Sequence, residues 1–365
     1  MPMSHSIGRS ILLVARGADP VGIGREVEIM ALGLRDAGWG VHVACTTVGG
    51  SLPARLIAAG LPVHAVGRRP VPDAAANLRL SRLVLGIRPG TVLAWGRPQA
   101  RMAAVATCLA KGLGHVPRLV CRVAVGPRGP ADAWAVTRGD RVVASSHGVA
   151  TACNRAGVSM RRLVTVEPAA AAAAAEGLSR ETIAARLQLD PAARWSLCVA
   201  PLVAASRLDR LLWAIDQLGV VHRGLQHVLV GRGPQLHRLL RRARVQHLAE
   251  RLRIVPACGC LPDLLREVEY VWQSGDVALG GVLFDAMSVG KPAVAVASDA
   301  ARQAIVDGET GWIVPSLPES EFPRRAFSVI EDQSLAVRFG AAAQARAAAE
   351  FCPQRFVTRM LEAIG

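Results

Sequence analysis

The sequence contains few lysines and few aromatic residues. Only Lys111 and Lys291 are lysines among its 43 basic residues, so almost all of its positive charge is carried by arginine. Aromatic residues make up 4% of the chain, and no basic run is interleaved with tyrosine or phenylalanine. Proteins that bind single-stranded nucleic acid stack the bases on such aromatic side chains. The composition therefore makes nucleic acid an unlikely partner.

Paired cysteine motifs are also absent. The eight cysteines are scattered, no CxxC occurs, and Cys258-x-Cys260 is the only close pair. A structural zinc site needs two such clusters at ligand spacing. We therefore expect no metal and no cofactor, and we expect the cysteines to be buried free thiols in a reducing cytoplasm.

Long apolar runs are missing as well. Ile11–Ala15 is a five-residue apolar run that Arg16 ends, which is too short for the core of an export signal. No stretch of about 18 uncharged apolar residues occurs, so no transmembrane helix is expected. These absences favour a cytoplasmic protein, either free or peripheral at the inner membrane face.

The charge that is present is unevenly distributed. Residues 1–180 contain 22 Arg or Lys against 9 Asp or Glu, a net charge of +13, whereas residues 181–365 contain 21 against 19, a net of +2. Such an asymmetry between halves indicates an anionic partner for the first half. An anionic membrane surface is one candidate and nucleic acid is the other.

The first half alternates short apolar strands with helical segments. Ile11–Ala15 reads as a buried parallel strand, Gly22-Ile-Gly24 as a turn that opens a helix over 25–37, and Val41–Cys45 as the next strand. The second half repeats this order. Its predicted strands include Trp195–Ala200, Leu252–Val255 and Ala293–Val296, and its predicted helices include Leu208–Leu218, Gln235–Arg251 and Leu261–Glu267. The pattern predicts an α/β protein with two doubly wound parallel sheets. The uninterrupted alanine run Ala169–Ala175 is expected to join the two, either as a linker or as a short helix.

From His227 onward, the motifs and their order resemble glycosyltransferase family 4, which has the GT-B fold. The segments that carry the resemblance are His227-Val-Leu-Val-Gly-Arg-Gly-Pro234, Leu261-Pro-Asp-Leu-Leu265, Leu283-Phe-Asp-Ala-Met-Ser-Val-Gly-Lys-Pro292 and Ile305-Val-Asp-Gly-Glu-Thr-Gly-Trp-Ile-Val-Pro315. The resemblance implies two Rossmann-like domains that face each other across a cleft. It places an acceptor domain at 1–175, a nucleotide-sugar domain at 176–350 and, at 351–365, a helix that packs back on the first domain.

The resemblance also implies a reaction. Members of the family transfer a hexose from a nucleoside diphosphate sugar to a glycan or lipid-linked acceptor, with retention and without a metal. The family stabilises the departing diphosphate with an arginine and a lysine after the first strand of the second domain. Here Pro201 stands at the arginine position and Ser206 at the lysine position, so both cations are lost.

The two glutamates of the family are changed too. Val277 stands at the first position, which in the family faces the donor sugar, and Asp285 stands at the second, which binds the ribose hydroxyls. Asp285 keeps a carboxylate that is one methylene shorter, whereas Val277 has no polar group. The neighbouring Asp276 could be recruited by a small shift of the loop.

Other residues could replace the lost contacts. Arg207 directly follows the lost lysine position, and Arg232 lies in the glycine turn between Gly231 and Gly233. We expect the donor site to be lined by these two arginines, by the glycines beside them and at two further positions, and by the two aspartates. In full, it comprises Gly24, Arg207, Gly231, Arg232, Gly233, Asp276, Gly280 and Asp285. Arg122 and Arg128 are candidates to contact the acceptor, and the catalytic residue itself is not identified.

Three functions stay open at this point. The first is a divergent glycosyltransferase with altered donor contacts. The second is a catalytically inactive GT-B protein that binds a glycan, a nucleotide or a partner protein. The third, a nucleic-acid binder attracted by the basic first half, has the least support because the aromatic residues are so few.

Overall fold

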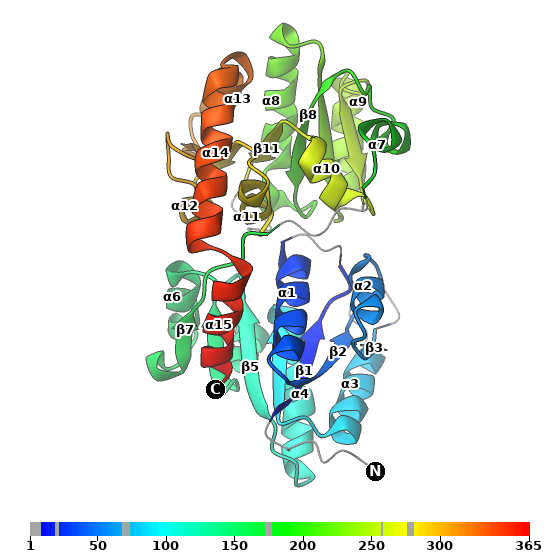
Figure 1. Ribbon diagram of the computed structural model, residues 1–365, viewed down its shortest axis with the longest axis vertical. Coiled ribbons are helices and arrows are strands. Elements are labelled where there is room, and N and C mark those ends of the chain that lie inside the picture. The colour runs from blue at the N-terminus through cyan, green and yellow to red at the C-terminus, as the bar shows by residue number, and fades with distance from the viewer. Residues whose placement is uncertain (1–8, 19–21, 68–73, 172–176, 257, 276–280) are drawn as a thin grey trace. The chain divides into compact units, whose positions relative to one another are not determined.

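The computed structural model describes residues 9–18, 22–67, 74–171, 177–256, 258–275 and 281–365 (Figure 1). The chain divides into two compact units. The first consists of Met1–Pro20, Gly24–Pro168 and Pro353–Gly365, and the second of Val21–Ile23 and Ala169–Cys352. Each unit is an α/β structure with its own core, as expected for a chain of this length.

The first unit is built on a seven-stranded parallel sheet. Its strands are β1 (Ser10–Ala15), β2 (Gly40–Cys45), β3 (Val63–Ala65), β4 (Thr91–Trp95), β5 (Arg118–Val123), β6 (Arg141–Ala144) and β7 (Leu163–Thr165). Their order is β3-β2-β1-β4-β5-β6-β7, so the order reverses between β1 and β4. The central strands are almost continuous runs of Val, Leu and Ile, as required of strands covered by helices on both faces.

Helices connect and cover these strands. They are α1 (Ile23–Asp36), α2 (Leu52–Ala58), α3 (Ala74–Ile87), α4 (Arg97–Gly112), α5 (Pro130–Thr137), α6 (His147–Arg155) and α15 (Pro353–Ile364), with a 3₁₀ turn at Met160–Arg162. Although α15 comes from the end of the chain, it belongs to this unit (Figure 1). Phe356 of α15 lies beside Trp95, and Gly33 of α1 makes room for Val357, whose methyl groups a Cβ at Gly33 would meet at 2.6 Å.

The second unit is built on a six-stranded parallel sheet of order β10-β9-β8-β11-β12-β13. The strands are β8 (Arg194–Val199), β9 (Leu225–Val230), β10 (Leu252–Val255), β11 (Tyr270–Gln273), β12 (Ala293–Val296) and β13 (Gly311–Val314). The helices are α7 (Arg180–Leu187), α8 (Leu208–Val221), α9 (Leu236–Val245), α10 (Leu261–Glu267), α11 (Gly281–Ser288), α12 (Asp299–Ala304), α13 (Glu321–Glu331) and α14 (Gln333–Glu350), with a 3₁₀ turn at Ala204–Ser206.

The helix predicted over 235–251 is shorter than expected. The structure ends α9 at Val245, because His247 adopts a left-handed conformation (φ 53°) that a right-handed helix cannot continue. The Leu248 N–H then donates to the Ala243 carbonyl at 2.8 Å, which gives one of the last carbonyl groups of the helix a hydrogen-bond partner. Of the alanine run, residues 169–171 are not helical and 172–175 lie outside the described residues.

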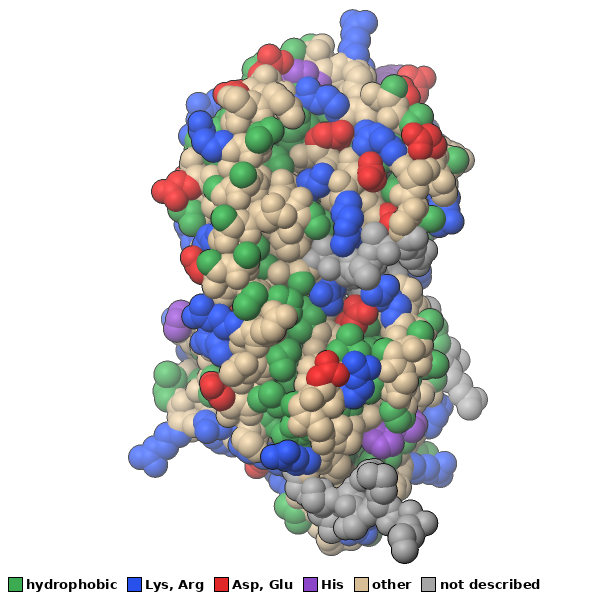
Figure 2. Space-filling view, in the orientation of Figure 1, with side chains coloured by type: hydrophobic (Ala, Val, Ile, Leu, Met, Phe, Trp, Pro, Cys, Tyr) green, Lys and Arg blue, Asp and Glu red, His purple; other side chains and the backbone are tan. Residues whose placement is uncertain are grey.

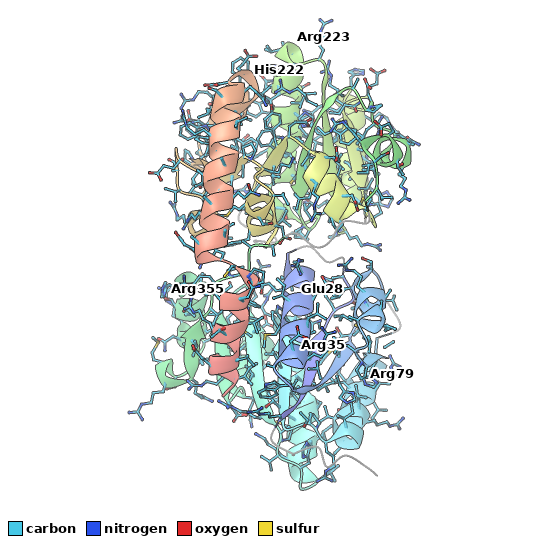
Figure 3. All side chains as sticks on the ribbon, viewed as in Figure 1. Glu28, Arg35, Arg79, His222, Arg223 and Arg355 are labelled. Carbon is cyan, nitrogen blue, oxygen red and sulfur yellow. The ribbon has the colours of Figure 1, made fainter. Side chains whose placement is uncertain are left out.

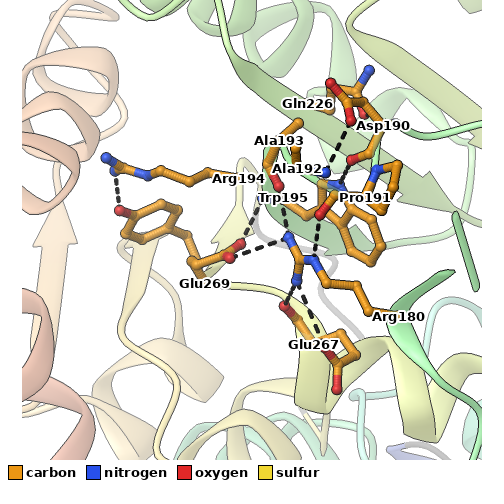
Figure 4. Close-up of polar contacts among 11 residues, drawn as sticks. Arg180, Asp190, Pro191, Ala192, Ala193, Arg194, Trp195, Gln226, Glu267 and Glu269 are labelled. Atoms are coloured by element: carbon orange, nitrogen blue, oxygen red, sulfur yellow. Dashed lines mark hydrogen bonds and ion pairs between the residues drawn. The ribbon is translucent and has the colours of Figure 1, made fainter.

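Partly buried arginines stabilise both units through ion pairs, ring contacts and hydrogen bonds to backbone carbonyls. In the first unit, Glu28 of α1 pairs with Arg55 at 2.9 Å and with Arg25 at 3.4 Å; Figure 3 labels Glu28 on its helix. In the second unit, the Arg180 guanidinium lies 3.8 Å from the centre of the Trp195 ring. It also donates to backbone carbonyls, including that of Ala193 at 2.6 Å (Figure 4). These arginines are therefore structural, which leaves fewer of them free to bind a ligand.

Arg122, a sequence candidate for contact with the acceptor, is also structural. Its side chain is 1% exposed and bonds the Glu26 carboxylate at 3.1 Å through Nη2 and 3.3 Å through Nε. Further donation reaches the carbonyls of Ala144 and Val166, and the guanidinium faces the Phe356 ring. Because its side chain is buried and its hydrogen bonds go to the protein itself, Arg122 does not reach the surface in this structure.

None of the described helices is both long enough and apolar enough to cross a membrane. The face drawn in Figure 2 carries basic side chains over both units.

Candidate functional site

The candidate donor site lies at the carboxyl ends of the central strands of the second unit. In open parallel sheets, ligands bind outside the carboxyl ends of the strands. Strands β9, β8 and β11 are neighbours there, and each is followed by a loop that contains predicted site residues. The loop after β8, residues 200–207, contacts the loops on both sides of it.

On the β9 side, glycine is required by close packing of two backbones. A Cβ at Gly231 would lie 1.9 Å from the Ala200 carbonyl oxygen, and one at Gly233 would lie 2.4 Å from that of Leu202. The Leu202 N–H donates to the Arg232 carbonyl at 2.9 Å and fixes the two loops together. Both glycines are thus explained by the fold of the loop, whether or not a ligand binds beside them.

On the β11 side, the packing is equally close. A Cβ at Gly275 would lie 2.5 Å from the Ser206 carbonyl oxygen, and the Ser274 hydroxyl donates to that oxygen at 3.1 Å. Ser274 and Gly275 were not among the residues predicted for the site. The sequence did indicate them, because two small residues that directly follow a buried strand are typical of a close-packed loop.

Pro201 and Ser206, the two positions where the sequence resemblance implied lost cations, bond to each other. The Ser206 hydroxyl donates to the Pro201 carbonyl at 2.6 Å, and the Ser206 side chain is buried. This bond closes the β8 loop on itself. The loop is therefore stabilised without a cation at either end, and neither residue presents a positive charge to a ligand.

Two arginines lie on these loops with exposed side chains. Arg207 is the N-cap residue of the 14-residue helix α8 and has a left-handed backbone (φ 50°, ψ 36°). No hydrogen bond or ion pair of its guanidinium is found among the described residues. Arg232 donates from Nε to the Pro256 carbonyl at 3.1 Å.

The predicted carboxylate Asp285 is present but already bonded. It lies on α11, is 1% exposed, and its Oδ2 accepts the Gly22 N–H at 2.6 Å; the unit boundaries assign both residues to the second unit. Gly24 is buried in the first turn of α1, in the first unit. Asp276, Val277 and Gly280 lie outside the described residues.

A second feature, which sequence reasoning missed, lies in the first unit. A hollow of about 320 Å³ is lined by Arg97, Arg101, Arg128, Gly129, Pro130 and Asp132, among others. We call it the arginine hollow. The candidate Arg128 belongs to it, whereas Arg97, Arg101 and Asp132 went unrecognised, although two arginines four residues apart at the start of a helix were visible in the sequence.

Titratable groups elsewhere have structural explanations. Burial, with a smaller contribution from Arg251, lowers the pKa of His227 to about 3, and its Nδ1 lies 2.6 Å from the Ser196 hydroxyl. The Cys260 thiol has a pKa lowered to about 7, chiefly by a hydrogen bond with Cys258. Among the described residues, no three His, Cys, Asp or Glu side chains gather where they could hold a metal ion.

Comparison with known proteins finds a family model and solved structures that this chain resembles. Residues 179–346 match the family model described as glycosyl transferases group 1. The structure of Alr3699/HepE from Anabaena in complex with UDP-glucose superposes with a TM-score of 0.78 at 17% identity, covering 97% of this chain and 98% of that one. Sucrose-phosphate synthase from Thermosynechococcus elongatus gives a TM-score of 0.75 at 16% identity, covering 97% and 98%.

A glycosyltransferase from Rickettsia africae is similar over 97% of each chain, with a TM-score of 0.72 and 16% identity. No curated protein matches the sequence. Two parallel-sheet α/β units and these structural relatives establish that the chain has the GT-B fold, which confirms the predicted fold class. The family match falls on the unit that contains the candidate donor site.

Proposed function

We propose that this protein is a glycosyltransferase that takes a hexose from a nucleoside diphosphate sugar and transfers it, with retention, to a glycan or lipid-linked acceptor. One observation carries the proposal. The unit that matches the glycosyl transferase group 1 model has, at the carboxyl edge of its sheet, two exposed arginines on neighbouring loops, Arg207 and Arg232. The solved relative Alr3699/HepE was crystallised with UDP-glucose, which supports a nucleotide-sugar donor.

The chemistry assigns a role to each arginine. When a glycosidic bond to a diphosphate breaks, negative charge develops on the leaving phosphate, and positioned cations and N–H groups stabilise it. Arg207 begins α8, so its guanidinium and the helix N-terminus can act on the same anion. Its left-handed backbone costs about 1 kcal/mol for a residue other than glycine. A strained arginine at a ligand-binding edge is consistent with a functional side chain.

The donor is expected to bind weakly. A helix N-terminus contributes about 0.3–1 kcal/mol toward an exposed anion, whereas each positioned cation contributes about 1.5–3 kcal/mol. Loss of the cations at Pro201 and Ser206 therefore removes about 3–6 kcal/mol, or two to four powers of ten in affinity. Arg207 and Arg232 recover only part of this, because both are exposed to solvent.

A second candidate is a GT-B protein that binds a glycan, nucleotide or partner without turnover. Two specific contacts favour it: the Ser206–Pro201 hydrogen bond and the Gly22–Asp285 hydrogen bond. In both, a group at a family ligand position is used to stabilise the fold. Measurement of turnover separates the two candidates.

The experiment compares three variants by calorimetry and by sugar-transfer assay with common nucleoside diphosphate sugars. Arg207→Ala and Arg232→Ala should weaken donor binding, with Arg207→Ala abolishing what can be detected. Arg244→Ala is the control, because Arg244 is an exposed arginine on the neighbouring helix α9. Donor binding that is equal in all three variants would refute the assignment of the two arginines. Binding without turnover would select the second candidate.

A further inference from the structure

The arginine hollow has more positive charge than its own structure neutralises. Asp132 accepts from Arg97 Nη1 at 3.1 Å and pairs with Arg101 Nε at 3.4 Å. The same carboxylate accepts the backbone N–H of Arg128 at 3.0 Å. The Arg128 side chain is exposed and has no hydrogen bond or ion pair among the described residues. One buried carboxylate thus shares the hollow with three guanidinium groups, which leaves a net charge of about +2 by ordinary side-chain ionisation.

The placement of these arginines is unfavourable without a further anion. Arg97 and Arg101 lie in the first turns of the 16-residue helix α4, which has no acidic residue there. Helix N-termini have a partial positive charge and disfavour cations. Burial lowers the pKa of the Arg97 guanidinium, and the Asp132 carboxylate raises it. Arg128 and Arg101 lower it further, because the three positive charges repel one another.

The backbone around the hollow is also suited to an anion. The N-cap residues of α4 and α5 are Gly96 and Gly129, and neither helix has a side-chain cap. Strands β4 and β5, which precede these helices, are neighbours in the sheet. The starts of both helices line the hollow, that of α5 with Asp132 in its first turn. They lie at the carboxyl edge of the sheet, the edge at which open parallel sheets bind ligands.

We infer that the arginine hollow binds a phosphate group carried by the acceptor. A phosphate monoester has a charge of about −1.5 to −2 at neutral pH, which matches the unneutralised charge better than a single carboxylate does. Arginine suits it further, because the planar guanidinium binds phosphate oxygens in pairs. That the phosphate belongs to an acceptor rests on the proposed glycosyltransferase function, whereas the anion site itself does not.

The test is calorimetric titration of the full-length protein with inorganic phosphate at fixed, low ionic strength. Arg128→Ala leaves the ion pairs of Asp132 intact, so folding should be unchanged, and phosphate affinity should fall about tenfold. The double variant Arg101→Ala/Arg128→Ala should lower it by about 100-fold. Arg82→Ala, which removes an exposed arginine of α3, is the matched control and should have no effect.

Two further arms assign the source of the phosphate and separate this inference from the proposed donor site. Vesicles of phosphatidylcholine with phosphatidic acid test a lipid headgroup, against phosphatidylcholine alone. If the wild-type protein binds the vesicles that contain phosphatidic acid and the double variant does not, the acceptor is lipid-linked. If the protein binds inorganic phosphate but not these vesicles, the acceptor is soluble. Arg207→Ala/Arg232→Ala should keep phosphate binding in the hollow even if donor binding is lost. Phosphate affinity that is unchanged in Arg101→Ala/Arg128→Ala would overturn the inference.

Discussion

The carboxyl edges of the two sheets differ in how their loops are stabilised. In the second unit, the loops after β8, β9 and β11 pack backbone against backbone, through Gly231, Gly233 and Gly275. A serine–proline hydrogen bond closes the central loop. In the first unit, the loops after β4 and β5 leave a hollow of about 320 Å³ lined by three arginines.

The difference indicates where each unit can hold an anion. Both sheets follow the same strand–helix alternation. Among the described residues, however, three arginines line one hollow at the edge of the first unit, whereas Arg207 and Arg232 lie on separate loops at that of the second. The sequence has the same asymmetry, with a net charge of +13 over residues 1–180 and +2 over 181–365. A fold that is similar in both units thus supports unequal electrostatics, because the loops set the charge and the sheets do not.

The largest expected change in stability comes from breaking the ion pair of a buried arginine in the first unit, compared with breaking that of an exposed one. Glu26→Ala leaves the Arg122 guanidinium buried without its carboxylate, so the free energy of unfolding should fall by about 3–5 kcal/mol. Urea denaturation measures the change. Asp36→Ala on the same helix removes an exposed ion pair with Arg35 and should cost less than about 1 kcal/mol. Equal effects of the two variants would mean that Arg122 is not held by Glu26.

The next effect tests backbone packing at the edge of the second unit. Gly231→Ala places a Cβ 1.9 Å from a carbonyl oxygen, and the free energy of unfolding should fall by about 3 kcal/mol because two backbones must separate. Gly86→Ala in α3 is the control: a Cβ there meets nothing within 4 Å, so the change should raise stability by about 0.5–1 kcal/mol. A tolerated Gly231→Ala in thermal denaturation would show that the loops pack less closely than described.

A third prediction compares how the stability of each unit depends on pH through one histidine, His227 in the second unit and His42 in the first. His227 stays neutral in the folded second unit, with a pKa of about 3 against 6.5 when unfolded. Only the unfolded state gains its proton below pH 6.5, so stability is lost as pH falls from 6.5 toward 3, at up to about 1.4 kcal/mol per pH unit.

The stability difference between pH 7 and pH 5 should therefore shrink by about 2 kcal/mol in His227→Gln, measured by urea denaturation at both values. In the first unit, burial and the adjacent His64 lower the pKa of the half-buried His42. His42→Gln should change the slope less, because that ring is closer to solvent. A larger change in His42→Gln would reverse the comparison.

Much of the fold could be predicted from the sequence. Strands β10 and β12 and helix α10 have the predicted bounds, and β1 differs by one residue, because short apolar runs between glycine turns leave little choice of structure. The end of α9 could not be predicted, since Arg244–Arg251 has no proline or glycine and the helix ends through the left-handed His247.

The site was harder to predict. The motif spacing located the loops of Arg207 and Gly231, but that the Ser206 hydroxyl bonds the Pro201 carbonyl depends on three-dimensional closure of the loop. The arginine hollow joins residues more than 30 positions apart, Arg97 and Asp132, and no local pattern marks such a pair. The burial of Arg122, a candidate for contact with the acceptor, could not be foreseen because its partner Glu26 lies 96 positions away.

The most direct test of the central claim, that the donor edge has lost its positioned cations, is the donor affinity itself. Calorimetric titration of the full-length protein with nucleoside diphosphate sugars should give dissociation constants in the millimolar range or no measurable heat, with slow turnover; absent turnover would select the non-catalytic candidate. Whatever binding is detected should disappear in Arg207→Ala and persist in Arg244→Ala. Micromolar binding with ordinary turnover that neither Arg207→Ala nor Arg232→Ala changes would contradict the account.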